Sequence, residues 1–255
     1  MGAAIFAAPF QVRMGKMSDR FLREEMLLGS AALERLRKSR VMVLGLGGVG
    51  SWCAEALARA GIGTVILVDQ DTVSESNINR QLCATSATIG QAKAEIMARR
   101  LSEINPEGSF LPVAARYEAA ARESFFTYEP DFIVDAIDLV ACKTDLIRTA
   151  KERGVPIVSA LGTGNKSDAS KLCICDIQKT IGCPLARVVR RELRRMGINH
   201  HTVVYSPEEA MEPEQSEAPP PGRRSVPGSL VWVPASAGML LAQHVVMTLA
   251  GECGG

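Results

Sequence analysis

The sequence predicts an α/β fold: a Rossmann-like, doubly wound and mostly parallel sheet, followed by a C-terminal extension of strands and helices. Three observations support this class. Short apolar runs alternate with helical patterns over the first 160 residues. One of these runs, at 41–44, leads through glycines directly into a helical pattern. The chain has 255 residues, 47% of them hydrophobic, which suffices for one large domain or one domain with an appended lobe.

The first part of the chain contains two helical patterns and then five apolar runs. Helices are expected at 19–28, where Gly29 provides a stop, and at 31–38. The expected strands lie at 40–44, 64–68, 109–113, 131–135 and 156–160. The helices between them are expected at 49–60, 90–104, 118–127 and 142–153. Because the strands are apolar almost throughout, we expect a parallel sheet covered on both faces, with ligands at the carboxyl ends of its strands.

The regular alternation stops after residue 160. A loop is expected at 161–167, a strand at 172–176 and a helix at 184–196. Residues 206–228 are rich in Pro and Glu, which predicts a mobile loop. Asn165 and Lys166 lie in the loop that follows the last regular strand, and we expect that loop to close over the strand ends.

The C-terminal segment 229–250 is apolar and approaches the roughly 20-residue length of a membrane span. Pro234 and several polar residues as far as Thr248 interrupt it, and no basic residues flank it closely. We therefore expect a strand that ends near Pro234, then a buried helix, and no stable insertion into a membrane.

Composition limits the possible partners and the redox compartment. The formal net charge is +1, so any surface for nucleic acid must be local. The seven cysteines are scattered, and no Cys-x-x-Cys pair occurs. This pattern predicts reduced thiols, no zinc site and a cytoplasmic protein.

The most informative segment is Gly45-Leu-Gly47-Gly48-Val-Gly50, which joins an apolar run to a helical pattern. Glycines at such a turn let the backbone approach a phosphate closely. The N-terminus of the helix then offers unpaired N–H groups and a positive dipole to the anion. The turn therefore predicts a nucleotide site, and on this ground alone the nucleotide could be NAD or ATP.

Polar residues downstream favour ATP. Asp69 ends the second strand, where a carboxylate accepts both ribose hydroxyls. Asp71 adds a carboxylate near the phosphates, which suits Mg²⁺. Arg80 and Lys93 supply cations for charge that develops on a triphosphate. Asp138 follows the fourth strand and should face the same crevice. Asn77 and Asn79 lie in the same short segment as Arg80 and supply amide groups beside it.

The ordered set Gly-x-Gly-Gly-x-Gly, Asp-x-Asp, Asn-x-x-Arg-Gln, Lys and Asp-x-x-Asp resembles the enzymes that adenylate ubiquitin and the small sulfur-carrier proteins. The resemblance runs from about residue 20 to residue 156. It implies that Gly48 and its neighbours cradle the phosphates of ATP and that Asp69 holds the ribose. Arg80 and Lys93 would neutralise the triphosphate, and Asp138 would position Mg²⁺ or the reacting groups. The implied catalytic residues are Arg80, Lys93, Asp138 and Arg23.

Arg23 lies in the first predicted helix. It resembles the arginine that, in this family, reaches into the active site of the neighbouring subunit. The resemblance therefore implies a homodimer.

The second half selects a branch of the family. Residues 176–186, Asp-Ile-Gln-Lys-Thr-Ile-Gly-Cys-Pro-Leu-Ala, and the arginine-rich helix after them are similar to the tRNA threonylcarbamoyladenosine dehydratases. This resemblance implies ATP-dependent cyclisation of threonylcarbamoyladenosine beside the anticodon, with release of pyrophosphate and AMP. It leaves open recruitment of a sulfur-transfer partner, a cysteine desulfurase system. Cys183 departs from the pattern, since Asp is expected before Pro-Leu.

Two alternatives use the same residues. Activators of ubiquitin-like sulfur carriers share the adenylating set, but they usually carry two Cys-x-x-Cys pairs that this sequence lacks. An NAD-dependent oxidoreductase would also use the Gly-x-Gly-x-x-Gly turn.

The helix at 184–196 points independently to RNA. Its arginines recur at helical spacing and are expected to form one outward stripe of five guanidinium groups suited to tRNA phosphates. Leu185, Val189 and Met196 are expected on the opposite, docked face. The stripe consists of Arg187, Arg190, Arg191, Arg194 and Arg195.

We expect three segments along the chain. Residues 1–16 form an N-terminal extension without function, with Met17 as an alternative start to Met1. Residues 17–160 form the ATP-binding, adenylating domain. Residues 161–255 form the tRNA-binding region, which continues the same globular unit.

Overall fold

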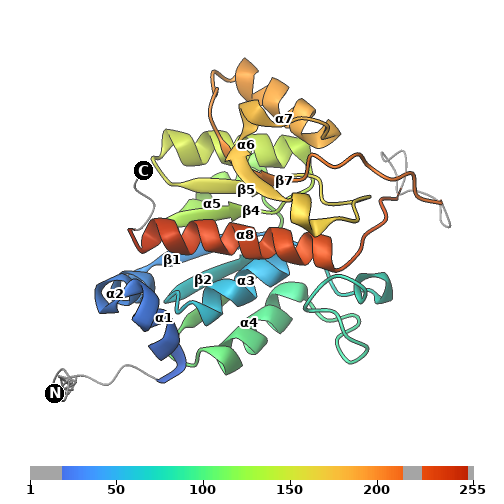
Figure 1. Cartoon of the computed structure of the whole chain (residues 1–255). Coiled ribbons are helices and arrows are strands. Elements are labelled where there is room, and N and C mark those ends of the chain that lie inside the picture. Colours follow the sequence, from blue (N-terminus) through green and yellow to red (C-terminus); the bar gives the residue numbers. More distant parts are fainter. Residues whose placement is uncertain (1–18, 215–225, 252–255) are drawn as a thin grey trace, which may run out of the picture.

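The computed structural model describes residues 19–214 and 226–251. In this part of the chain one seven-stranded sheet has the order β3-β2-β1-β4-β5-β7-β6 (Figure 1). All neighbours pair in parallel except β6, which is antiparallel to β7 at the edge. The strands are β1 (Arg40–Leu44), β2 (Thr64–Val68), β3 (Ser109–Val113), β4 (Phe132–Asp135), β5 (Ile157–Ala160), β6 (Cys173–Asp176) and β7 (Thr202–Tyr205). The predicted α/β class with a mostly parallel sheet is confirmed.

Helices cover both faces of the sheet, which is why its strands are apolar throughout. Val41 and Val43 of β1 belong to the hydrophobic core under α3, α4 and α8. Met42 and Leu44 belong to the second core, under α5, α6 and α7. The helices are α1 (Leu22–Leu28), α2 (Ser30–Lys38), α3 (Gly50–Arg59), α4 (Lys93–Ile104), α5 (Arg122–Phe126), α6 (Val140–Glu152), α7 (Pro184–Arg195) and α8 (Trp232–Leu249).

The sheet continues beyond residue 160 through β7, a strand that was not predicted. Val203 of β7 lies between Ser159 of β5 and Cys175 of β6. The four residues of β7 are β-branched or aromatic, and Ser206-Pro207 follows them directly, so a local strand signal was present but was not used. Residues after β5 therefore extend the same sheet.

The strand predicted to end near Pro234 is wrong. Helix α8 begins at Trp232, and Pro234 lies in its first turn, where the missing N–H of proline has no helical partner to lose. By length and composition α8 could cross a membrane, but it lies along α3 in the fold (Figure 1). A Cβ on Gly238 would come within 2.5 Å of the Val49 carbonyl oxygen, so only glycine permits this close helix contact.

The prediction of a mobile loop at 206–228 is wrong for the two parts that the structure describes, 206–214 and 226–228. Met211 and Gly228 both form backbone hydrogen bonds with Asn165, so both ends of this segment are attached to the body of the protein. The middle of the predicted loop, 215–225, and the extension at 1–16 with Met17 lie outside the described residues.

Candidate nucleotide site

The carboxyl ends of β1 to β5 converge on one cavity of about 560 Å³. This is the edge at which open parallel sheets bind ligands, because each strand delivers its following loop there. Loops from distant parts of the chain meet in its lining. The predicted site residues among them are Gly45, Gly47, Gly48, Asp69, Asp71, Arg80, Lys93 and Asp138.

The glycine turn closes because two of its positions exclude a side chain. Gly45 has φ +90°, and a Cβ there would lie 2.7 Å from the Ala136 carbonyl oxygen. A Cβ on Gly50 would lie 1.8 Å from the carbonyl oxygen of Gly45. Gly50 is buried and is not among the lining residues, so its predicted contact with ATP is replaced by a packing role. The remaining glycines present the N-terminus of α3 to the cavity.

Asp69 is held in place by the turn that it faces. One carboxylate oxygen accepts a hydrogen bond from the Leu46 N–H at 2.6 Å, and the other accepts one from the Asp71 N–H at 2.8 Å. Burial raises the pKa of the Asp69 carboxyl above its ordinary value, against the lowering effect of these bonds. The carboxylate therefore has a fixed orientation on the cavity wall.

Lys93 and Asp71 form an ion pair with an Nζ–Oδ2 distance of 3.1 Å. The Lys93 side chain is only 6% exposed, whereas that of Asp71 is 57% exposed. The expectation that Asp71 serves the phosphates or a metal is therefore modified: it lines the cavity, but its carboxylate neutralises and orients Lys93. Lys93 is the first residue of α4, which points its ammonium group at the cavity edge.

Arg80 lines the cavity from the segment after β2. Its Nη1 donates to the Ser76 carbonyl oxygen at 2.7 Å and to Asn79 Oδ1 at 2.9 Å, which leaves other N–H groups of the guanidinium for a ligand. Asn77 has a different role from the predicted one. It is buried, and its Oδ1 accepts the Ser74 N–H, which caps a short 3₁₀ turn. It does not belong to the cavity lining.

Asp138 is exposed and lines the cavity just after β4. Its loop is anchored by Asp135, whose Oδ1 accepts the Ile137 N–H at 3.0 Å. Asp135 Oδ2 pairs with Lys143 Nζ at 2.6 Å, and both of these side chains are 0% exposed. Lys143 also donates to the Ala160 carbonyl oxygen at 3.0 Å. This buried pair ties the loop after β4 to the end of β5.

Several lining residues were absent from the predicted set. Arg116 and Thr163 follow β3 and β5, so the rule that ligands sit at strand ends could have found them. Residues 227–229 and Pro234 return to the cavity from the C-terminal part of the chain, and no local pattern indicates this.

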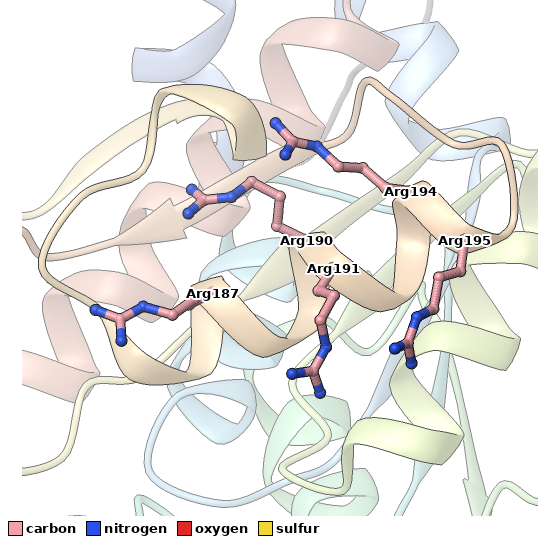
Figure 2. Close-up of a pocket in the computed structure, with 5 residues that line it drawn as sticks. All are labelled: Arg187, Arg190, Arg191, Arg194 and Arg195. Atoms are coloured by element: carbon pink, nitrogen blue, oxygen red, sulfur yellow. The ribbon is translucent and has the colours of Figure 1, made fainter.

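The five arginines of α7 line one open surface hollow of about 430 Å³, as their spacing predicts, but they do not all point outward. Arg190 is half-buried, and its Nη1 donates to the backbone oxygen and to Oγ1 of Thr180, each at 2.8 Å. In Figure 2, Arg191 and Arg195 point to one side of the helix. Arg190 and Arg194 point to another. The side chains therefore leave the helix in different directions around this hollow, and Arg190 contacts the protein's own backbone.

The docked face of α7 also differs from the prediction. Its buried residues are Ala186, Val189 and Leu193, while Met196 is 42% exposed at the end of the helix. Cys183 is the N-cap of α7: it is 5% exposed, and its Sγ accepts a hydrogen bond from the Ala186 N–H at 3.4 Å. The resemblance predicted Asp at this position, which is a preferred N-cap residue, and Cys183 caps the helix in its place.

Arg23 is exposed on α1 and does not line the cavity of its own chain. Helix α3 separates the two. Its N-terminus lies at the cavity, while Gly61, just beyond its C-terminus, contacts Phe21 at the start of α1. Arg23 could act only in the cavity of another copy.

Comparison with known proteins agrees with this geometry. The chain matches the model of the ThiF family over residues 21–254. It is 40% identical over 242 residues to the tRNA threonylcarbamoyladenosine dehydratase of Bacillus subtilis, which covers 91% of this chain and 95% of that protein.

Two crystal structures of the tRNA N6-threonylcarbamoyladenosine dehydratase of E. coli share the fold at 32% identity. The complex with AMP has a TM-score of 0.84 and covers 94% of this chain and 98% of that one. The complex with ATP has a TM-score of 0.83 and covers 92% and 97%. The chain therefore belongs to the ThiF family and, within it, to the tRNA threonylcarbamoyladenosine dehydratases.

Proposed function

We propose that this protein uses ATP to cyclise threonylcarbamoyladenosine beside the anticodon of tRNA. The observation that carries the proposal is the convergence of Asp69, Arg80, Lys93 and Asp138 on one cavity, in a chain alignable with a dehydratase over almost its full length. The E. coli relative binds ATP, the substrate of an adenylation step, and AMP, which leaves when the acyl-adenylate is consumed.

The lining residues support one orientation of ATP. The Asp69 carboxylate accepts the ribose hydroxyls, and the phosphates approach the N-terminus of α3 at Gly47 and Gly48. Arg80 and Lys93 lie on the same lining and meet the negative charge of the triphosphate. Asn79 orients Arg80 and does not itself bind the nucleotide.

The lining also fits Mg²⁺ bound together with the phosphates. Among the described residues no group of three or more His, Cys, Asp or Glu side chains could hold a metal by itself. Mg²⁺ commonly takes one or two carboxylates, and phosphate and water oxygens complete its shell. Asp138 would supply the carboxylate, and the ion would offset charge on the leaving pyrophosphate.

The reaction then needs two steps. The threonyl carboxylate attacks the α-phosphorus of ATP, and the bond to the β-phosphate breaks to release pyrophosphate. The carbamoyl group of the same nucleoside attacks the resulting acyl-adenylate, loses a proton and expels AMP. The ring closure is intramolecular, so the protein needs to hold the two ends together but supplies no nucleophile.

The decisive experiment is mass analysis of tRNA nucleosides after incubation of the purified protein with ATP, Mg²⁺ and tRNA that carries threonylcarbamoyladenosine. We expect loss of one water from that nucleoside and stoichiometric AMP. Pyrophosphate exchange that depends on a sulfur-carrier protein instead of tRNA would indicate the carrier activator. Tight NADH binding without any exchange would indicate an oxidoreductase.

We further propose that the exposed arginines of α7 bind tRNA phosphates. Replacing Arg187, Arg191 and Arg194 together with glutamine should weaken tRNA binding. It should also lower the slope of log K against log salt by about 1 for each phosphate that is no longer neutralised. Binding measured by fluorescence anisotropy at several salt concentrations checks this.

Arg190→Gln provides the matched control, because Arg190 is bonded to Thr180 and not directed to solvent. It should lower the melting temperature and leave the salt slope unchanged. An unaltered salt slope in the triple variant would assign the tRNA contacts to another surface.

The exposed face of α1 supports the proposed homodimer. Leu22, Met26 and Leu27 are 43%, 76% and 87% exposed there, beside Arg23. Burial of these residues against a second copy would bring Arg23 toward that copy's cavity. If the molar mass measured in solution at micromolar protein concentration is that of one chain, the homodimer is excluded.

The remaining expectations follow from the substrate. Residues 17–160 would carry the adenylating function, and residues 161–255 would carry tRNA recognition. A cytoplasmic location is consistent with substrates such as tRNA and ATP. Recruitment of a cysteine desulfurase system stays a prediction of the resemblance.

A further inference from the structure

Three loops that are far apart in the chain meet beside the cavity, and they are held by a small set of polar residues. The loops are the segment after β5, the segment after β7 and the segment before α8. The residues that hold them are Asn165, Lys166 and Glu208, which we call the loop clamp.

Asn165 uses both its backbone and its side chain in the clamp. Its backbone N–H donates to the Gly228 carbonyl oxygen at 2.8 Å, and its Oδ1 accepts the Gly228 N–H at 2.6 Å. Its carbonyl oxygen accepts the Met211 N–H at 2.8 Å. Its φ of +58° lies in the left-handed region, which asparagine tolerates better than most residues. One residue thus joins two segments that are 17 positions apart in the sequence.

Glu208 holds the other side of the clamp. Its carboxylate accepts the N–H groups of Ser167 at 3.0 Å and of Asp168 at 3.1 Å, and it also accepts the Ser167 hydroxyl at 2.8 Å. Lys166, which is 4% exposed, donates to the Glu208 carbonyl oxygen. These bonds fix the loop after β5 against the loop after β7.

The clamp continues into the cavity wall. Gly164, Gly228 and Ser229 line the cavity directly next to the clamped residues. The Ser229 carbonyl oxygen accepts a hydrogen bond from Asn79 Nδ2 at 3.0 Å, and Asn79 Oδ1 accepts one from Arg80. A chain of hydrogen bonds therefore connects the clamp to the guanidinium of Arg80.

Sheet order shows which part of the reaction this wall serves. Asp69 follows β2, whereas Thr163 and Gly164 follow β5, and β1 and β4 lie between those two strands. The wall is therefore across the cavity from the ribose-binding carboxylate. In the proposed orientation of ATP the phosphates lie between the two, and the wall then faces the side from which an acceptor reaches them.

We propose that Asn165 is a positioning residue that holds this wall, and through it Arg80, for the incoming tRNA nucleoside. The inference rests on the proposed function, because it names the part of the fold that admits the acceptor. Asn165 touches neither ATP nor the reacting atoms; it acts through Gly228, Ser229 and Asn79.

Three substitutions separate the contributions of Asn165. Asn165→Asp keeps the Oδ1 acceptor and tolerates the positive φ. Asn165→Gly keeps the backbone hydrogen bonds and the conformational freedom but loses the Oδ1 acceptor, and Asn165→Ala loses both the acceptor and the freedom. We expect Asn165→Gly to lower kcat for cyclisation about tenfold or more and to raise the KM for tRNA, because small misplacement of reacting groups costs up to about 100-fold. The Kd for ATP should change much less than the KM for tRNA, because Arg80 is also held by the Ser76 carbonyl oxygen, which does not depend on the clamp. Asn165→Asp should restore near wild-type turnover.

Stability and the wild-type protein serve as controls. Melting temperatures identify variants whose activity falls because they unfold. Glu208→Ala provides a second test: it should also raise the KM for tRNA while the Kd for ATP changes little. If Asn165→Gly leaves both kcat and the KM for tRNA unchanged, or weakens ATP binding in parallel, the positioning role is wrong. If the wild-type protein itself makes no cyclised product, the proposed function fails instead.

Discussion

Replacing Arg80 with alanine is expected to abolish tRNA-dependent release of AMP and pyrophosphate while the protein stays folded. The Arg80 guanidinium lies on the cavity lining with two hydrogen bonds to its own segment, so its position is set before ATP binds. Arginines that stabilise charge in phosphoryl transfer contribute about 10³- to 10⁵-fold to the rate. Turnover measured by AMP formation and folding measured by circular dichroism check this prediction.

A control and a conservative variant define the role of Arg80. Arg37→Ala removes an exposed arginine that lies just before the amino end of β1, away from the cavity edge, and should leave turnover unchanged. Arg80→Lys keeps the charge but loses the planar fork, so it should recover only part of the activity. Undiminished turnover of Arg80→Ala would remove this residue from the mechanism.

Lys143→Met is expected to destabilise the fold by about 3–5 kcal/mol, because removing one partner of a buried ion pair leaves the other charge uncompensated. The Lys143 and Asp135 side chains are both 0% exposed and lie 2.6 Å apart. Lys143 also holds the Ala160 carbonyl oxygen, so its loss frees the loops that carry Asp138 and Thr163. Urea unfolding followed by fluorescence measures the decrease in the free energy of unfolding.

The double variant Lys143→Met, Asp135→Asn tests whether the uncompensated charge is the cause. Asparagine keeps an oxygen for the Ile137 N–H but carries no charge, so it should recover part of the stability. If the double variant is less stable than Lys143→Met alone, the destabilisation comes from poorer packing and not from the uncompensated charge of Asp135.

Much of the fold could be predicted because its elements are locally encoded. The strands at 40–44, 64–68 and 109–113 match the structure residue for residue, since each is a short apolar run with a clear boundary. The strand at 202–205 was missed although Ser206-Pro207 marks its end, because a run of four residues is short and is completed only by pairing with β5 and β6.

The candidate site was predictable to the extent that its residues follow strands. Asp69 comes directly after β2 and Asp138 three positions after the end of β4, and parallel strands bring such positions to a common edge. Asn77 occurs in the same motif as Arg80, yet its side chain caps a turn. Residue type and spacing could not tell whether Asn77 binds the nucleotide or caps a turn, because an asparagine amide can do either.

Local sequence was sufficient for the parallel α/β class, the phosphate-binding turn and the order of the adenylating residues, because each depends on neighbours within a few positions. Three other features became visible only in the folded chain: Asp71 orients Lys93, Arg190 contacts the backbone of its own chain, and residues 227–229 form a wall of the cavity. The first and the third depend on where the chain returns after a crossover, and local residue patterns carry no information about that. The second depends on how the loop before α7 folds back on the helix.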